Sequence, residues 1–186
     1  MNINQLLMAQ HREAEKLFEE LEEAEPEQRR ALSTALAAKL EMHMELEEQI
    51  VYPAIRRLVE GSDRDVAEAG AEHELVRRGI EQLLALDADT PGFDGLIAML
   101  KAGVLHHVEE EEKEVLPNLA ESATKHQLEE LARQCQERIV RAGGRSPAID
   151  AEAATRDELY DRAREADIDG RSDMTKEELA AALEHS

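Results

Sequence analysis

The stretch His43-Met-Glu-Leu-Glu47-Glu48-Gln-Ile-Val-Tyr-Pro53 carries the pattern that decides the fold of this chain. It returns as His107-Val-Glu-Glu-Glu111-Glu112-Lys-Glu-Val-Leu-Pro117, so that His, Glu and Pro stand at offsets of zero, four and ten in both copies. Residues four apart share one face of a helix, and each copy therefore directs an imidazole nitrogen and a carboxylate oxygen the same way. Two such helices facing each other predict a paired transition-metal site.

Two further histidines lie at matching intervals before these motifs. His11 precedes His43 by 32 residues, and His73 precedes His107 by 34 residues. We expect helices over about 3–24, 26–59, 63–86 and 93–122, so that the first and third helices each contribute one histidine. The short connections favour an antiparallel up-down four-helix bundle, built from two hairpins related by an approximate twofold axis. That symmetry would bring four histidines and two glutamates to one place.

Local signals refine the ends of these helices. Pro53 and Pro117 lie inside the second and fourth helices, where we expect a kink or a break. Gly61 should end the second helix, and Ser62 and Asp63 should cap the third. A fifth helix is expected over about 124–141.

Composition supports an all-α protein and bounds its partners. Aromatic residues make up 2% of the chain and Trp is absent, whereas strong helix formers are abundant. The 43 acidic and 22 basic residues leave a formal net charge of -21, which argues against binding nucleic acid or an anionic membrane. Cys135 is the sole cysteine, so no internal disulfide can form. Neither a secretory signal nor a membrane span is expected, and the cytoplasm is the predicted location.

Hydrophobic periodicity predicts which polar side chains face the core. His11, His43, His73 and His107 each fall on an apolar stripe of their helix; that of His11 includes Leu7, Met8, Ala14 and Phe18. Burying an unpaired carboxylate costs several kcal/mol, a cost that a bound metal removes. The candidate metal ligands are therefore His11, His43, Glu47, His73, His107 and Glu111.

Neighbouring polar residues are expected to play smaller parts. His106 and Glu110 are also four apart, but they share a stripe with Met99 that should face solvent, so His106 is expected at the surface or behind the ligands. The remaining acidic residues of the run 109–114 are predicted to form a solvated face. For Tyr52, next to Pro53, we favour a packing role over a hydrogen bond to the site.

On these residues the chain resembles the hemerythrin-like family, also called the HHE cation-binding domain, over about residues 1–140. The resemblance implies a non-haem di-iron centre that binds dioxygen or peroxide. By that likeness Glu47 and Glu111 would bridge the irons, with His11 and His43 on one iron and His73 and His107 on the other. Imidazole and carboxylate ligands also suit zinc or manganese.

The chain departs from oxygen-carrying hemerythrins at one position. Those proteins place a fifth histidine one turn after the third-helix ligand, where this sequence has Arg77, whose guanidinium cannot ligate a metal. The equivalent position after His11 is Glu15. Two hypotheses follow: Glu15 ligates or hydrogen-bonds the centre, or Glu15 pairs with Arg77 across the bundle. A site with fewer ligands is more open, which suits peroxide breakdown, sensing or iron handling better than oxygen carriage.

Three segments are expected along the chain: a bundle with its trailing helix over 1–141, a linker over 142–154, and a small helix-loop-helix module over 155–186. The module is similar to the Rho amino-terminal and SAP type, some members of which bind nucleic acid. Its acidic balance favours docking to a protein partner instead. An EF-hand reading of Asp167, Asp169, Asp173 and Glu178 is weak, because Arg171 and Ser172 stand where an acidic residue and Gly are wanted.

The leading hypothesis is thus a cytoplasmic di-iron protein that handles oxygen, peroxide or iron, with enzymatic activity left open. Two alternatives remain at this point. One is a metal-free helical interaction or adaptor protein. The other is a nucleic-acid-associated regulator acting through the carboxy-terminal module.

Overall fold

A computed structural model describes residues 1–143, 160, 171, 174–176 and 178–179 of the 186-residue chain. The chain divides into two compact units, one formed by Asn2–Leu131 and the other by Met1 with Ala132–Ser186. Within the described residues the regular structure is entirely helical, which confirms the expected all-α class. In that same part of the chain, no helix is both long enough and apolar enough to cross a membrane.

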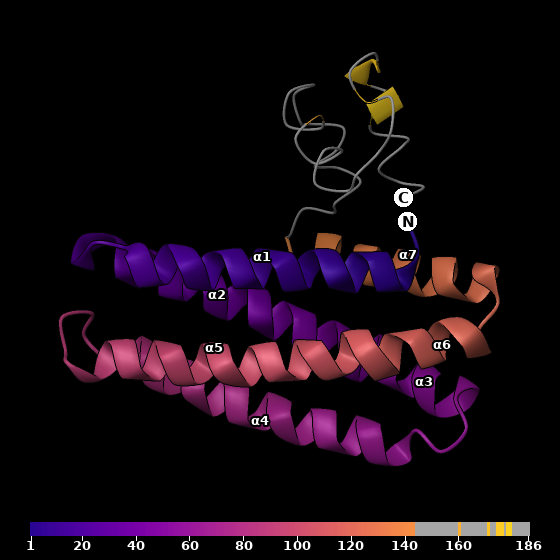
Figure 1. The fold of residues 1–186 in the computed structure, drawn as a ribbon, viewed down its shortest axis with the longest axis horizontal. Coiled ribbons are helices and arrows are strands. Elements are labelled where there is room, and N and C mark those ends of the chain that lie inside the picture. The colour runs from indigo at the N-terminus through magenta and orange to yellow at the C-terminus, as the bar shows by residue number, and fades with distance from the viewer. Residues whose placement is uncertain (144–159, 161–170, 172–173, 177, 180–186) are drawn as a thin grey trace. The chain divides into compact units, whose positions relative to one another are not determined.

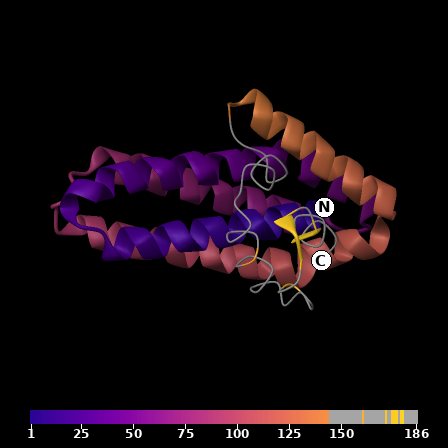
Figure 2. The same ribbon diagram turned by 90° about the horizontal axis from the view of Figure 1, so that it is seen from above.

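The first unit is built around four long antiparallel helices (Figure 1). These are α1 (Ile3–Glu23), α2 (Pro26–Leu46), α4 (Asp63–Ala85) and α5 (Gly92–Glu110). Around the bundle, α1 packs on α2, α2 on α4, α4 on α5, and α5 on α1. Seen from above in Figure 2, the long helices again lie side by side. The predicted up-down bundle is confirmed, and each predicted boundary lies within one residue of the observed one for α1, α4 and the start of α5.

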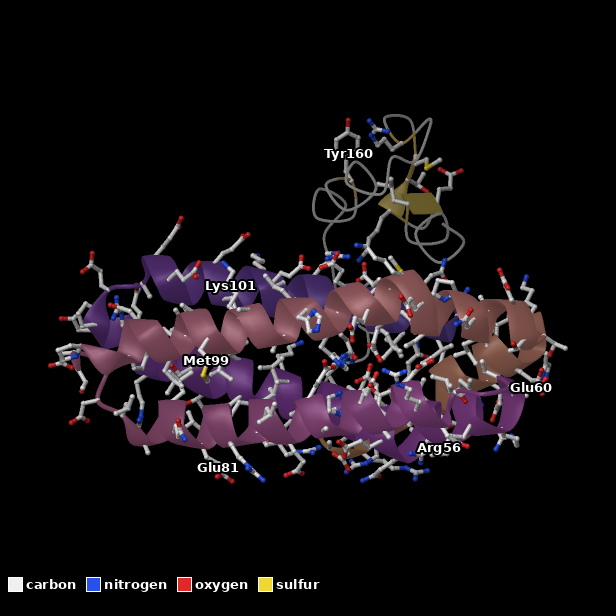
Figure 3. All side chains as sticks on the ribbon, turned by 60° about the horizontal axis from the view of Figure 1, so that its bottom comes forward. Arg56, Glu60, Glu81, Met99, Lys101 and Tyr160 are labelled. Carbon is white, nitrogen blue, oxygen red and sulfur yellow. The ribbon has the colours of Figure 1, made fainter. Side chains whose placement is uncertain are left out.

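Apolar stripes on the four helices meet in one hydrophobic core. Its largest buried members include Phe18, Leu21, Leu36, Leu83, Phe93 and Ile97. Full burial of a side chain of this size contributes about 1.5 to 3 kcal/mol, so these stripes hold the bundle together. The outer faces carry charge: Glu81 projects from α4 and Lys101 from α5, while Met99 on α5 is 54% exposed (Figure 3). The predicted solvent-facing stripe through Met99 is confirmed.

The second and fourth predicted helices are each interrupted by a π-helical turn, η1 (Glu47–Val51) and η2 (Glu111–Val115). Each turn is followed by a short α-helix, α3 (Tyr52–Leu58) or α6 (Leu116–Ser122), with its proline in the first turn. Proline has no N–H to donate and its ring clashes with the carbonyl four residues earlier, whereas a π turn pairs residues five apart. The expected break therefore occurs in the turn before each proline, not at the proline itself.

The junction between α3 and α4 differs in detail from the prediction. Gly61 ends this stretch in the left-handed region at φ 79°, a conformation that glycine adopts without a steric cost. Ser62 does not cap α4 with its side chain. Its hydroxyl instead donates a hydrogen bond of 2.9 Å to the carbonyl of Val59, so it satisfies the end of the preceding helix.

Helix α7 (Lys125–Arg141) spans the boundary between the two units, close to the expected 124–141. Beyond it Gly143 has φ 78°, in agreement with a helix end at the start of the expected linker. Within the predicted module, Thr175 and Glu178 exchange backbone-to-side-chain hydrogen bonds of 2.7 and 3.2 Å, the capping box that starts a helix. The expected first helix of the module, about 155–166, lies outside the described residues except for Tyr160. Asp167, Asp169 and Asp173, on which the weak EF-hand reading depends, also lie outside them.

Candidate metal centre

The six predicted ligands converge inside the first unit, where the two π turns face the helices α1 and α4. His11 lies on α1 and His73 on α4, and each is brought inward by the apolar stripe of its helix. His43 and His107 lie in the last turns of α2 and α5. Glu47 and Glu111 are the first residues of the two π turns. All six residues are buried, with at most 8% of their surface exposed.

Glu47 lies between the two halves of this cluster. One carboxylate oxygen, Oε1, is 3.1 Å from Nε2 of His43. The other, Oε2, is 3.2 Å from Nε2 of His73. The two oxygens therefore face histidines of the two halves of the cluster.

Glu111 approaches both halves through a single oxygen. Its Oε2 lies 3.4 Å from Nε2 of His11 and 3.7 Å from Nε2 of His107. The four histidines form two similar pairs: the ring centroids of His11 and His43 are 4.8 Å apart, as are those of His73 and His107. Candidate ligand atoms form two groups, and within each group all of these atoms lie within 4.8 Å of one another. The first group contains His11, His43, Glu47 and Glu111, and the second contains Glu47, His73 and His107.

Several atoms of the cluster are buried without a hydrogen-bond partner. Within the described residues these include Nε2 of His11, Nε2 of His43, Oε1 of Glu47 and Oε2 of Glu111. An unpaired buried polar atom costs about 1 to 3 kcal/mol, so four of them in one place call for a compensating ligand. Imidazole nitrogen with carboxylate oxygen is a donor set for a borderline transition-metal cation, and these residues therefore fit such an ion.

The second ring nitrogen, Nδ1, of each of the four clustered histidines also has a polar partner. Nδ1 of His11 contacts Glu112 at 2.8 Å and Nδ1 of His73 contacts Glu48 at 2.9 Å. The corresponding partners of His43 and His107 are Gln10 at 2.9 Å and Glu72 at 2.7 Å; these residues directly precede His11 and His73 in sequence. A hydrogen bond from Nδ1–H to each acceptor leaves the Nε2 lone pair directed into the site.

These outer partners were not predicted from the sequence, and for Glu112 the expectation was wrong. We expected it on a solvated face, whereas it bridges His11 and Arg12. Two signals were available: Glu48 and Glu112 directly follow Glu47 and Glu111 in the two motifs, and Gln10 and Glu72 directly precede His11 and His73. Neither signal predicts whether these side chains point toward the histidines or toward solvent.

Tyr52 also takes part in the site, and the packing role favoured from the sequence was incomplete. Its hydroxyl lies 3.1 Å from Oε1 of Glu111, a hydrogen bond that it donates, and 3.3 Å from Nε2 of His73. Its ring stacks on that of His73, with the centroids 5.6 Å apart. The equivalent residue of the second motif is Leu116, so Tyr52 breaks the pseudo-twofold symmetry.

Burial and charge set the protonation of the cluster. Burial lowers the pKa of His43 to about 3. Burial has the same effect on His107, but it is outweighed by Glu47, Glu72 and Glu111, which raise the pKa of His107 to about 10. Burial and the neighbouring carboxylate of Glu47 raise the pKa of Glu111. For Glu47 burial is outweighed by His43, His107 and His73, which lower its pKa. The like charges and opposed pKa shifts are typical of a functional site.

The remaining candidates are placed elsewhere. His106 is 63% exposed in side chain and lies near Glu110 and Glu72, at 3.5 and 3.8 Å, as expected for a surface residue. Glu15 pairs with Arg12, and Arg77 pairs with Glu48. The hypothesis that Glu15 pairs with Arg77 is therefore wrong, and the hypothesis that Glu15 ligates a metal stays a prediction. Met8, expected on the buried stripe of α1, is 41% exposed.

The fold and the site define a four-helix-bundle protein with a buried cluster of metal-ligating side chains. Residues 2–119 match the family model described as the hemerythrin HHE cation-binding domain. The chain belongs to this family, which confirms the resemblance found in the sequence.

Two similar proteins extend this comparison. A crystal structure of a hemerythrin HHE cation-binding domain-containing protein from Mycobacterium kansasii superposes with a TM-score of 0.68. It shares 24% sequence identity and the match covers 98% of this chain and 99% of that one, which supports the fold. A protein of Nostoc sp. strain PCC 7120 named DNA nickase is 26% identical over 133 residues. That match covers 71% of this chain but only 37% of the length of the relative.

Proposed function

We propose that this chain is a non-haem di-iron protein that handles dioxygen, peroxide or iron. His11 and His43 would hold one iron, His73 and His107 would hold the other, and Glu47 and Glu111 would bridge them. The observation that carries the proposal is the convergence of four histidines on two buried carboxylates, each of which has one oxygen without a hydrogen-bond partner. Two divalent cations would neutralise these carboxylates and occupy the unpaired lone pairs.

The protein's own residues would perform three tasks at such a centre. The outer partners Glu48, Gln10, Glu72 and Glu112 orient the imidazoles through Nδ1. The buried walls exclude bulk water from the two carboxylates. Tyr52 places a hydroxyl proton within hydrogen-bond distance of Glu111, where it can stabilise negative charge. Iron, when bound, would supply one-electron redox chemistry and open coordination positions for a small ligand.

The small number of ligands favours reactions over oxygen carriage. Six protein ligands shared by two cations leave several coordination positions open, and Arg77 occupies the position of the fifth histidine of oxygen carriers while binding Glu48 on the outside. We therefore favour peroxide breakdown, oxygen or redox sensing, or iron storage. Zinc or manganese could use the same donors, and metal analysis decides among them.

The test is elemental analysis of the full chain purified without oxygen. We expect about two irons per chain, and at most one in the His43→Ala and His107→Ala variants, because each substitution removes one ligand. The matched control is His106→Ala, which removes the neighbouring but exposed histidine and should leave the iron content unchanged. A wild-type chain that is folded and binds no cation would overturn the proposal and leave the metal-free interaction protein as the alternative.

DNA is not part of the proposed function. The net charge of -21 opposes association with a polyanion, and the acidic residues are distributed over the exposed helix faces. The name DNA nickase belongs to a relative of which this chain spans about a third. A protein partner for residues 155–186 remains part of the proposal, since an acidic module favours a basic protein surface.

A further inference from the structure

The two halves of the centre are alike in the contacts of Nδ1 of His11 and His73, although Tyr52 lies against Nε2 of His73. Nδ1 of His11 contacts Glu112 at 2.8 Å, and Nδ1 of His73 contacts Glu48 at 2.9 Å; each glutamate directly follows Glu111 or Glu47 in its motif. Each of these glutamates is held in turn by an arginine, Arg12 or Arg77. The arginines come from different positions of α1 and α4, but the resulting chains of contacts are alike.

The halves differ around the other two histidines. Nδ1 of His107 meets the carboxylate of Glu72 at 2.7 Å. Nδ1 of His43 meets the amide oxygen of Gln10 at 2.9 Å. Gln10 and Glu72 each precede a ligand histidine by one residue, so they are equivalent positions filled by a neutral and an anionic acceptor.

This difference in the acceptor at Nδ1 changes how strongly Nε2 of the same imidazole can bind a metal. A carboxylate draws the Nδ1 proton more strongly than an amide oxygen does, because a charge-assisted hydrogen bond is about twice as strong as a neutral one. The imidazole consequently becomes a better donor at Nε2. Loss of such an outer partner typically weakens metal binding by about 10- to 100-fold. The carboxylate of Glu72 also adds a negative charge near the cation, which the amide of Gln10 does not.

We propose that the two metal positions are unequal: a divalent cation occupies the position between His73 and His107 first and is held there more tightly, and the position between His11 and His43 fills second. This inference rests on the proposed two-metal centre. It gives the protein a half-loaded state at limiting metal, in which the second position exchanges its cation while the first retains it. Glu72 and Gln10 are the positioning residues that set this difference.

The experiment is a calorimetric titration of the metal-free full chain with Fe(II) in the absence of oxygen. Two cations so close together repel each other, so two steps alone do not identify the cause. The decisive variants are the reciprocal pair Glu72→Gln and Gln10→Glu. We expect Glu72→Gln to weaken the first step by about 10- to 100-fold and Gln10→Glu to tighten the second by a comparable factor.

Two further comparisons assign the steps to positions. The His43→Ala variant should retain the tight step, whereas His107→Ala should retain the weak one. The double variant Q10E/E72Q should reverse this assignment when combined with the same alanine substitutions. Controls for charge alone are Glu81→Gln and Gln82→Glu, both on the exposed face of α4, which should leave both steps unchanged.

The outcomes separate this inference from the function on which it rests. A folded wild-type chain that binds no cation overturns the proposed function. Two cations bound with steps that neither Glu72→Gln nor Gln10→Glu alters overturn the inference and leave the proposed function standing. Circular dichroism verifies folding, and if Glu72→Gln does not fold, Gln10→Glu alone decides: an unchanged second step contradicts the inference.

Discussion

The guanidinium of Arg77 donates two hydrogen bonds of 2.9 Å to Glu48, one to each carboxylate oxygen. The same carboxylate contacts Nδ1 of His73 at 2.9 Å. Arg77 thus contacts the buried cluster indirectly, through Glu48 and His73. A bidentate arginine fixes both the position and the orientation of its partner, which a flexible lysine does not.

Substitution of Glu48 should weaken metal binding more than substitution of Arg77. We expect Glu48→Gln to weaken Fe(II) binding by about 10- to 100-fold, because His73 loses its anionic acceptor. Arg77→Met should have a smaller effect, since Glu48 remains but is less well held. Anaerobic competition with a coloured chelator measures both. Arg64→Met, which removes an exposed arginine paired with Glu68 on the same helix, is the control. Equal binding by Arg77→Met and wild type would contradict the role assigned to Arg77.

The hydroxyl of Tyr52 should stabilise the metal-free protein. Tyr52→Phe keeps the ring against His73 but leaves Oε1 of Glu111 without its donor at 3.1 Å. Leaving a buried acceptor unpaired costs about 1 to 3 kcal/mol, and we expect the free energy of unfolding in urea to fall by that amount. Tyr52→Leu should cost more, because it removes ring packing as well. A Tyr52→Phe protein as stable as wild type would show that the hydroxyl makes no net contribution.

Metal uptake should release protons near neutral pH. The carboxylates of Glu47, Glu72 and Glu111 outweigh burial and raise the pKa of His107 to about 10, so its imidazole carries an extra proton at pH 7 in the metal-free protein. The pKa of His11 is also raised, by Glu111, Glu47 and Glu112, against the opposing effect of burial. A cation requires the neutral imidazole, so the extra proton of His107 must leave when the cation binds. Fe(II) affinity should therefore rise with pH up to about 10 and fall as the pH is lowered. Calorimetry in buffers of different ionisation enthalpy counts the protons. Uptake with no proton release at pH 7 would exclude His107 as a ligand.

Helix α4 offers a matched pair of glycines that should respond to alanine in opposite directions. A Cβ on Gly79 would lie 2.4 Å from Cδ2 of the buried Leu100, whereas one on Gly70 would meet nothing within 4 Å. Gly70→Ala should stabilise the protein by about 0.5 to 1 kcal/mol through helix propensity. Gly79→Ala should destabilise it by about 1 to 2 kcal/mol net, because overpacking outweighs that gain. Urea denaturation measures both, and a stabilised Gly79→Ala would mean that Leu100 moves aside without cost.

Much of the site was accessible from the sequence because it repeats. The offset of four between His and Glu fixes a shared helix face, and the repeat at His107 and Glu111 implies a facing copy. Periodicity then separated the buried His107 from the exposed His106 correctly. The sequence predicted a break near each proline but not that it would be a π turn. A proline shows that the helical hydrogen-bond pattern must be interrupted, but it does not specify the kind of interruption.

The sequence by itself determined the four helices, their inward faces and the six side chains that meet between them. Those features depend on local periodicity and on a repeat, both of which are carried by neighbouring residues of one helix. Only the tertiary structure shows which residues contact Nδ1 of the candidate ligand histidines and which residues hold those partners in place. Gln10 reaches His43, Glu72 reaches His107, and Arg77 reaches Glu48 across helix boundaries. Such contacts depend on the packing distance and rotation of two helices and on side-chain rotamers, which no spacing within one helix specifies.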